Sequence, residues 1–428
     1  MTTTRRGFIC GCSAAVAAMA GSRLSLAAFA PSASVNRDVL VVIFLRGGMD
    51  GLNVVAPLDG PDRGLYESAR PELMLPASGT GAMLPLDAQF GMNAAAAPLQ
   101  QLFVAGKLAI VHAVGMNVDS RSHFDCQEFV ELGTPGVKAT STGWLARHLQ
   151  CADNIPAATL MPSMAVGNSQ PTSLLGNYQT VAMNDPGDFD IDTGPWEWRD
   201  GQRLALRRIY SLGSTPVHVA GVQAMNAMDL VEAFAGGTAK PSNGAVYPDS
   251  DFGRHMALLG QMIKLDIGLR VAAIDLGGWD THQNEAYGGG QGYFADLLGD
   301  LAHGMAALYT DLDGSAADAP ARRLTVVVQS EFGRRVRENA DRGTDHGHGN
   351  PMLVLGGQVA GGFHGTWPGL APDQLYDGAD VAVTTDYRRV LSEVIIRRLA
   401  NPRLSVIFPG YSGYAPLGVV SGPDLAPV

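Results

Sequence analysis

The sequence has 428 residues, of which 46% are hydrophobic and 17% are charged, and its formal net charge at pH 7 is −11. A chain of this length and apolar content can bury a large core, which excludes an intrinsically disordered protein. An acidic chain without a basic stripe is also a poor partner for nucleic acids and for anionic membrane surfaces.

The chain begins with a segment typical of a twin-arginine export signal. Arg5 and Arg6 precede an apolar, alanine-rich stretch over residues 9–20. This stretch is shorter than the roughly 20 residues of a transmembrane helix, so we expect no stable membrane anchor. We predict that residues 1–30 are a signal peptide read by the twin-arginine export machinery, and that the protein is periplasmic or secreted. Residues 31–428 are predicted to form a single domain.

Short apolar runs and amphipathic segments alternate along the chain. The apolar runs predict buried strands at residues 39–45, 108–114, 271–276 and 324–328. The amphipathic segments predict helices at residues 94–105, 144–150, 201–210, 222–235, 252–269, 293–309 and 387–399. The alternation predicts an α/β fold with a central, mostly parallel sheet flanked by helices on both faces. Residues 185–201 are polar and turn-rich, which indicates an insertion or a lid.

The first two predicted strands lead into polar motifs. The motif RGGMDGLN places Arg46 and Asp50 on a glycine-rich turn, and SRSHFD places Ser122 and His123 before a helix predicted to start near Phe124. A serine at a helix start can act as a nucleophile, helped by the positive end of the helix dipole, or can simply cap the helix. His123 is a candidate proton donor or metal ligand, or else a packed residue.

The third predicted strand leads into GGWDTH, which presents Asp280 and His282. Residues two apart in an extended segment point to the same side, so both side chains can bind one ion. Arg334, which follows the fourth strand, and Arg46 are expected either to bind substrate anions or to hold acidic side chains together.

The fourth predicted strand is followed by the densest group of possible metal ligands. Glu331 stands directly after the strand in SEFGR, and TDHGHG supplies Asp345, His346 and His348 on a glycine-studded loop. Carboxylate oxygens and imidazole nitrogens are ligands for zinc, manganese or iron. The alternative is a polar surface turn.

These motifs are expected to meet, because the carboxyl ends of parallel strands lie at one edge of a sheet. The arrangement predicts a site for one or two divalent ions of unknown identity. Its expected ligands are Asp50, Asp280, His282, Glu331, Asp345, His346 and His348. Such ions can clamp a phosphate or sulfate oxygen and activate a hydroxyl nucleophile.

The motifs RGGMDGLN, SHFD, GGWDTH, SEFGR and TDHGHG, in this order behind a twin-arginine signal, resemble the DUF1501 family of exported bacterial proteins. The resemblance covers essentially the whole chain after the signal. That family is similar to the alkaline phosphatase and sulfatase superfamily, which implies an alkaline-phosphatase-like fold and a metal site at the strand ends. By position, the resemblance implies metal ligands at Asp50, Asp280, His282, Glu331 and either His346 or His348.

The chain departs from the superfamily pattern at three places. Asp50 lies four residues past Arg46, displaced from where a first-strand ligand normally falls. Phe332 follows Glu331 where alkaline phosphatases carry adjacent Asp and His, and no sulfatase motif surrounds Cys126. The leading hypothesis is an exported metal-dependent hydrolase of phosphate or sulfate esters, with Ser122 as the metal-activated nucleophile and a small-molecule or glycan ester as substrate. The alternatives are a non-catalytic binding or assembly protein on the same fold, and a phosphomutase or transferase.

Overall fold

The computed structural model describes residues 36–138, 140–156, 159, 161–185, 196–235, 240–286 and 291–428. The expected signal peptide, residues 1–30, lies outside the described residues, as do residues 186–195 of the expected insertion. Within the described part of the chain, none of the helices is long and apolar enough to cross a membrane.

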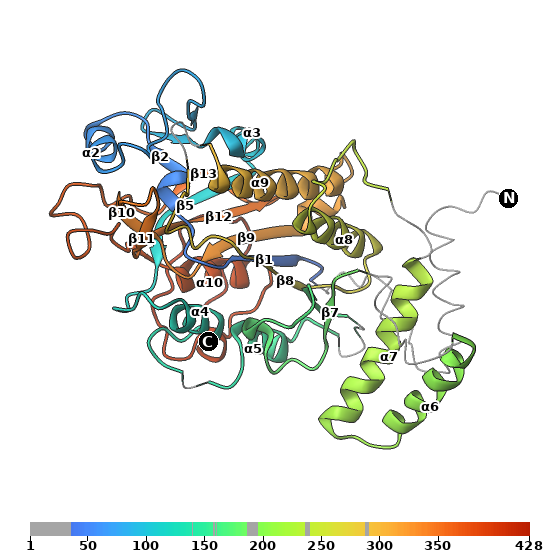
Figure 1. The fold of residues 1–428 in the computed structure, drawn as a ribbon. Coiled ribbons are helices and arrows are strands. Elements are labelled where there is room, and N and C mark those ends of the chain that lie inside the picture. Colours follow the sequence, from blue (N-terminus) through green and yellow to red (C-terminus); the bar gives the residue numbers. More distant parts are fainter. Residues whose placement is uncertain are drawn as a thin grey trace.

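A nine-stranded sheet forms the centre of the molecule (Figure 1). Its strands are β1 Val39–Leu45, β5 Leu108–Gly115, β6 Ser163–Val166, β7 Thr180–Met183, β8 Val271–Leu276, β9 Leu324–Ser330, β12 Asn350–Gly356, β13 Gly362–His364 and β14 Thr385–Asp386. Their order is β13-β5-β12-β9-β1-β8-β6-β7, with β14 beside β5. Only β12 pairs antiparallel with its neighbours in this sheet. The predicted mostly parallel sheet is therefore confirmed.

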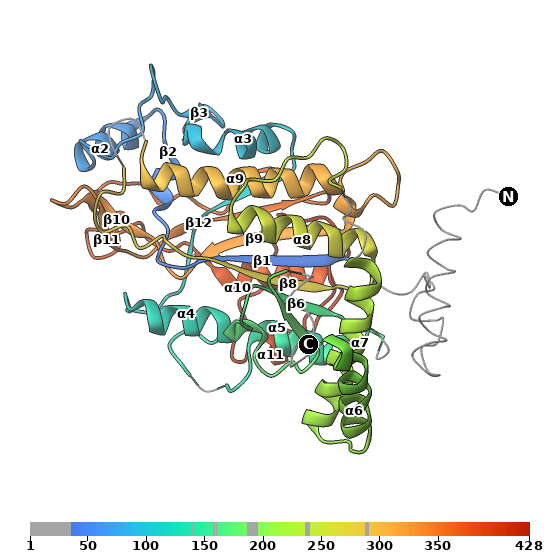
Figure 2. The ribbon, with the colours of Figure 1, turned by 45° about the vertical axis from the view of Figure 1, so that its right-hand side comes forward.

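Helices cover both faces of the sheet (Figures 1 and 2). One face carries α3 Ala97–Val104, α8 Asp251–Leu265 and α9 Tyr293–Leu312. The other carries α4 His123–Leu132, α5 Trp144–Cys151, α10 Tyr387–Arg397 and α11 Leu404–Ile407. Strand β1 shows why both faces must be covered, because Val41 and Ile43 enter one core while Leu40 and Val42 enter the other.

The remaining elements lie at the margins of this sandwich. Near one end of the sheet are α2 Pro61–Ala69, the small sheet of β2 Val55–Pro57, β3 Leu84–Pro85 and β4 Phe90–Met92, and the hairpin of β10 Arg334–Glu338 and β11 Thr344–His346. At the other end, α6 Arg199–Ser211 and α7 Pro216–Ala235 form a helical hairpin that projects from the body in both views (Figures 1 and 2).

Several boundaries differ from the sequence-based prediction. The helix expected over 252–269 ends at Leu265, because Asp266 adopts a left-handed conformation with φ 53°. Part of the TDHGHG segment forms strand β11 and not a loop, because it pairs with β10. The last residues of the expected insertion are helical, since α6 is preceded by a short 3-10 helix at Trp196–Trp198.

The strand register brings the polar motifs to one edge. Leu45 at the end of β1 pairs with Leu276 of β8 and with Ser330 of β9, so these three strands end level with one another. Strand β12 runs the opposite way and begins with Asn350 opposite Val114 of β5. The TDHGHG segment, which precedes β12, therefore reaches the same edge as the residues that follow β1, β8 and β9.

Candidate metal centre

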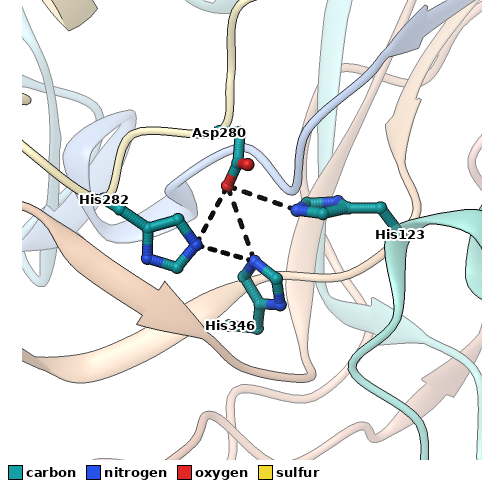
Figure 3. Close-up of side chains that lie close together, drawn as sticks. All are labelled: His123, Asp280, His282 and His346. Atoms are coloured by element: carbon teal, nitrogen blue, oxygen red, sulfur yellow. Dashed lines mark hydrogen bonds and ion pairs between the residues drawn. The ribbon is translucent and has the colours of Figure 1, made fainter.

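Four side chains converge at this edge: His123, Asp280, His282 and His346 (Figure 3). The Oδ1 atom of Asp280 lies 3.2 Å from Nε2 of His123, 3.1 Å from Nε2 of His282 and 3.5 Å from Nε2 of His346. The Nε2 atoms of His282 and His346 are 2.8 Å apart. One ligand atom from each residue lies within 4.8 Å of all the others, so the four can hold one metal ion.

The four residues of the cluster come from three segments at this edge of the sheet. Asp280 and His282 share the extended segment after β8. His123 is the first residue of α4, and His346 is the last residue of β11. The loop after β1 packs against Asp280. Gly47 in this loop has φ 122°, and a Cβ atom at this position would lie 2.4 Å from the Asp280 nitrogen. Glycine at position 47 thus permits the close approach of the two loops.

The three imidazoles are oriented by acceptors on their other ring nitrogen. Nδ1 of His123 lies 2.7 Å from Oε1 of Glu331, and Nδ1 of His346 lies 2.7 Å from the carbonyl oxygen of Arg121. Nδ1 of His282 faces Oδ1 of Asp345 at 3.4 Å. Carboxylates and carbonyls accept hydrogen bonds, so in His123 and His346 they fix the proton on Nδ1 and leave the Nε2 lone pair toward the centre, as is usual for histidines that bind metals.

This proton arrangement fits a bound cation. Three Nε2 lone pairs and the carboxylate of Asp280 point at one small volume, and lone pairs facing one another at close range repel unless a cation lies between them. Nε2 of His123 is buried and has no hydrogen-bond partner among the described residues. Three imidazoles and one carboxylate form a ligand set suited to zinc and to related transition-metal ions.

The surroundings of the cluster shift the pKa values of its members in opposite directions. The hydrogen bond to Glu331 raises the pKa of His123 above its usual value, and the carboxylate of Asp280 adds to this effect. Burial lowers the pKa of His346. Burial also opposes ionisation of Asp280, but the hydrogen bond and charge of Arg334 outweigh it and lower the pKa of this carboxyl group. Asp280 is therefore an ionised ligand at neutral pH.

The expected ligand Asp50 is placed elsewhere by the structure. Its buried carboxylate makes a bidentate ion pair with the guanidinium of Arg70, directly after α2. Nearby, the buried Glu285 accepts hydrogen bonds from Asn53 and Thr281. Burial and the charge of Asp50 raise the pKa of Glu285 well above its usual value. Asp50 thus belongs to a buried ionic network, and the structure does not bring it into the four-residue cluster.

Glu331 and Asp345 orient histidines of the cluster and are not themselves part of it. Glu331 is buried and accepts hydrogen bonds from the Gly47 nitrogen at 2.9 Å and from Gln127 at 2.8 Å, in addition to the bond from His123. These bonds outweigh burial and lower the pKa of Glu331. Of the expected ligands, these two acidic residues lie beside the cluster and outside it, because their oxygens face Nδ1 atoms on the outer side of the imidazoles.

His348 is also separate from the cluster. Its Nδ1 lies 3.1 Å from Asp380, and its Nε2 lies 3.2 Å from the Val118 carbonyl oxygen. The two histidines of TDHGHG diverge because β11 ends at His346. A Cβ atom at Gly347 would lie 2.5 Å from the backbone of Arg334, so only glycine permits this close approach directly after β11. Of the two histidines expected as ligands in this motif, the structure brings His346 into the cluster and places His348 outside it.

Arg334 and Arg46 hold acidic groups in place. Arg334 is buried, and its Nη2 donates to Oδ1 of Asp280 at 2.7 Å and to carbonyl oxygens of the surrounding loops. Arg46 pairs with Glu131 at 3.1 Å and with Asp275 at 2.8 Å. Of the two expected alternatives for these arginines, the structure favours the positioning of carboxylates over the binding of substrate anions.

Two groups that support the cluster were missed by the sequence analysis, one in direct contact with it and one through Glu331. The carbonyl oxygen of Arg121 orients His346, and no residue type signals the use of a backbone carbonyl. Gln127 donates to Glu331 from α4, four residues after His123. Residues four apart lie on the same face of a helix, so the helical spacing from His123 was a signal that pointed to Gln127.

Replacing Glu331 by glutamine is expected to weaken metal binding by about 10- to 100-fold, because the charge that fixes the proton on Nδ1 of His123 is lost. Equilibrium competition with a metal-chelating dye would measure the affinity. The matched control is Glu128→Gln, which changes an exposed glutamate on α4 that pairs with Lys138. Equal metal affinity in the two variants would refute the orienting role of Glu331.

Comparisons with known proteins agree with the sequence-based assignment for part of the chain. Residues 198–398 match the model of a family described as a protein of unknown function (DUF1501), which confirms the expected resemblance there. No curated protein matches the sequence. Among solved structures, a protein in the alkaline phosphatase superfamily from Vibrio parahaemolyticus aligns at 10% identity with a TM-score of 0.31, over 84% of this chain and 71% of that chain.

Proposed function

Since residues 198–398 carry the DUF1501 sequence pattern, and this segment includes Asp280, His282 and His346, we propose that the protein is a metal-dependent hydrolase of phosphate or sulfate esters. The observation that supports this proposal most directly is the convergence of three imidazole Nε2 atoms and one carboxylate at the edge of the sheet where β1, β8 and β9 end. The substrate class is supported by the resemblance of the motifs to the alkaline phosphatase and sulfatase superfamily.

The cluster has the features of a centre that acts on a bound ligand. His123, Asp280, His282 and His346 would hold one divalent ion, which supplies Lewis-acid polarisation of an ester oxygen. The side chain of Asp280 is 50% exposed and that of His282 is 40% exposed, so one side of the cluster faces solvent. On the opposite side, Arg334 fixes the carboxylate and Glu331 fixes His123, which keeps the ligand atoms in place while substrate binds.

The test is a metal analysis combined with an ester panel. The full-length protein, purified after native metal loading, is expected to hold about one ion per chain and to hydrolyse 4-nitrophenyl phosphate or 4-nitrophenyl sulfate. Removal of the ion with a chelator should abolish hydrolysis, and adding the ion back should restore it. Protein without stoichiometric metal would refute the metal centre. Stoichiometric metal without hydrolysis of any ester would favour the alternative of a non-catalytic binding protein.

Ser122, the expected nucleophile, serves as the N-cap of α4. Its Oγ accepts a hydrogen bond from the Asp125 nitrogen at 3.4 Å. Ser122→Ala is expected to lower the free energy of unfolding by about 1 kcal/mol, whereas Ser122→Asn, which keeps a capping oxygen, should be nearly neutral. Chemical denaturation measures both effects.

The same pair of variants separates capping from catalysis. If Ser122 acts as a cap alone, Ser122→Asn keeps its ester hydrolysis, because asparagine satisfies the helix terminus. If the hydroxyl attacks the ester, Ser122→Asn is inactive although the protein is folded and binds its metal. The cap geometry leads us to expect retention of activity. Loss of activity in this stable variant would restore the serine nucleophile.

We also propose that the protein is exported by the twin-arginine route, as Arg5 and Arg6 in their sequence context suggest. This route carries folded proteins, so the metal centre can be filled before export. Replacing both arginines by lysine is expected to retain the protein in the cytoplasm, because the export receptor reads the arginine pair. Cell fractionation and immunoblotting would show this. Equal periplasmic amounts of the variant and the natural protein would exclude the route.

A further inference from the structure

A cleft with a volume of about 460 Å³ opens beside the metal centre and has no role in the function proposed so far. It lies between α2, strand β10 and residues 370–379. Asp345 lines the cleft, and its Oδ1 is the atom that faces His282 of the cluster at 3.4 Å. The cleft therefore lies next to His282, on the outer side of its imidazole ring.

The floor of the cleft is aliphatic. It is lined by Leu65, Ala69, Val336, Leu370, Pro372 and Leu375. These side chains belong to, or pack against, a small hydrophobic core beneath the cleft, with the exception of Pro372. Among the described lining residues none is aromatic, so the cleft lacks the flat rings on which sugar rings commonly stack.

One wall of the cleft carries two guanidinium groups. Arg335 and Arg337 both line the cleft from β10. Nε of Arg335 forms a long ion pair of 3.9 Å with Asp380 and has no hydrogen-bond partner among the described residues, and the Arg335 side chain is 43% exposed. Arg337 is exposed and makes no hydrogen bond or ion pair with any described residue. Arg337 can therefore bind an anion, and Arg335 can join it with the guanidinium donors that do not face Asp380.

Two acidic side chains also line the cleft. Both carboxylate oxygens of Glu338 accept backbone N–H bonds from Glu72 and Leu73. Asp345 accepts a bond from Asn339 at 3.3 Å and faces His282 of the cluster. The guanidinium groups of Arg335 and Arg337 are the cationic groups of the cleft.

Resting on the proposed hydrolase function, we propose that this cleft binds the alcohol part of the substrate, an aliphatic chain that ends in a second anionic group. The aliphatic floor receives the chain, and Arg335 and Arg337 bind the terminal carboxylate, phosphate or sulfate. The ester group itself lies at the metal centre. The substrate class is then an ω-anionic alkyl phosphate or sulfate, and not a sugar ester.

A binding experiment tests the cleft without using catalysis. Metal-free protein is titrated with hexanoate, and with hexanol as the uncharged control, by ligand-observed NMR. Hexanoate should bind more tightly than hexanol, and the double variant Arg335→Gln/Arg337→Gln should weaken hexanoate binding about fivefold or more. The matched control Arg342→Gln removes a cation from the neighbouring β10–β11 turn that does not line the cleft, and it should leave binding unchanged. Equal binding of hexanoate in all three proteins would overturn the proposal.

A kinetic experiment then tests the link to the ester. The metal-loaded protein should show a lower KM for 6-phosphohexanoate than for hexyl phosphate, by about fivefold or more, with similar kcat, because the added carboxylate contributes binding that is equal in ground and transition states. The double variant should remove this difference. A preference for a phosphorylated or sulfated sugar over 6-phosphohexanoate would overturn the assigned substrate class. Hexanoate binding without hydrolysis of either ester would refute the hydrolase and leave the anion site standing.

Discussion

Replacing Asp280 by asparagine is expected to remove the bound metal and to lower ester hydrolysis by about a thousandfold or more, with the fold retained. Asp280 stands at the centre of the cluster, because its Oδ1 lies within 3.5 Å of all three imidazole Nε2 atoms. Its carboxylate also neutralises the buried guanidinium of Arg334 at 2.7 Å. Asparagine keeps the shape of the side chain but leaves the charge of Arg334 exposed to the ion, which repels it.

Metal-dependent stabilisation provides a readout that is independent of activity. An ion that binds the folded state at 100 times its Kd stabilises that state by about 2.7 kcal/mol, so zinc or manganese should raise the Tm of the natural protein and leave the Asp280→Asn variant unchanged. The matched control is Asp249→Asn, which alters a fully exposed carboxylate that does not belong to the cluster. A variant at Asp280 that keeps one ion per chain and hydrolyses esters within tenfold of the natural rate would disprove the assigned centre.

The strands of the sheet could be predicted from the sequence where burial on both faces requires a run of apolar residues. Strands β1, β8 and β9 are continuous apolar runs because each contacts helices on both sides, and such runs are visible in a single sequence. Strand β12 was missed because Pro351 stands near its start and interrupts the pattern. Strands β6 and β7 are only four residues long, and Ser163 and Thr180 in them dilute the apolar signal.

The candidate site was predictable to the extent that local geometry fixes where side chains point. Asp280 and His282 lie in one extended segment, so the two-residue period brings both to the same ion. The same rule misleads for His346 and His348, because the extended segment ends between them at Gly347. A sequence shows the spacing of two histidines but does not show where the strand that carries them stops.

Asp50 illustrates a different limit. Its role depends on Arg70, which lies twenty residues further along the chain, directly after α2. In the sequence alone, a carboxylate on a glycine-rich turn after a strand has the pattern of a metal ligand. Only the tertiary structure shows that a buried arginine pairs with it. Pairing between distant buried charges is a property of the tertiary structure, and neither composition nor spacing encodes it locally.

Replacing Arg70 by methionine is expected to destabilise the folded protein by about 3–5 kcal/mol, because it leaves the carboxylate of Asp50 buried without its cation. Arg70 is fully buried, pairs with Asp50 through two bonds and donates to the Val336 carbonyl oxygen at 2.8 Å. Chemical denaturation at pH 7 measures the loss. The control Arg254→Met removes a 61% exposed arginine from a surface pair, where about 0–1 kcal/mol is expected.

The double variant Arg70→Met/Asp50→Asn should recover part of the loss, since it removes the uncompensated charge together with its partner. Additivity of the two single effects, with no recovery, would show that the ion pair contributes nothing beyond packing. In the natural protein, burial opposes ionisation of Asp50, but the charge and hydrogen bonds of Arg70 lower its pKa below the usual value.

The pH dependence of the Arg70→Met effect follows from this lowered pKa. An acidic group with a lowered folded-state pKa stabilises the fold above its unfolded pKa of about 3.9, and this stabilisation is lost as the pH falls through the folded value. Without Arg70, burial instead raises the pKa of Asp50, so acid protonates the carboxyl group in the variant and relieves the penalty. The difference in unfolding free energy between the natural protein and Arg70→Met should therefore shrink as the pH is lowered from 7 to 4. A difference that stays constant over this range would mean that lost packing, and not an unpaired buried carboxylate, causes the destabilisation.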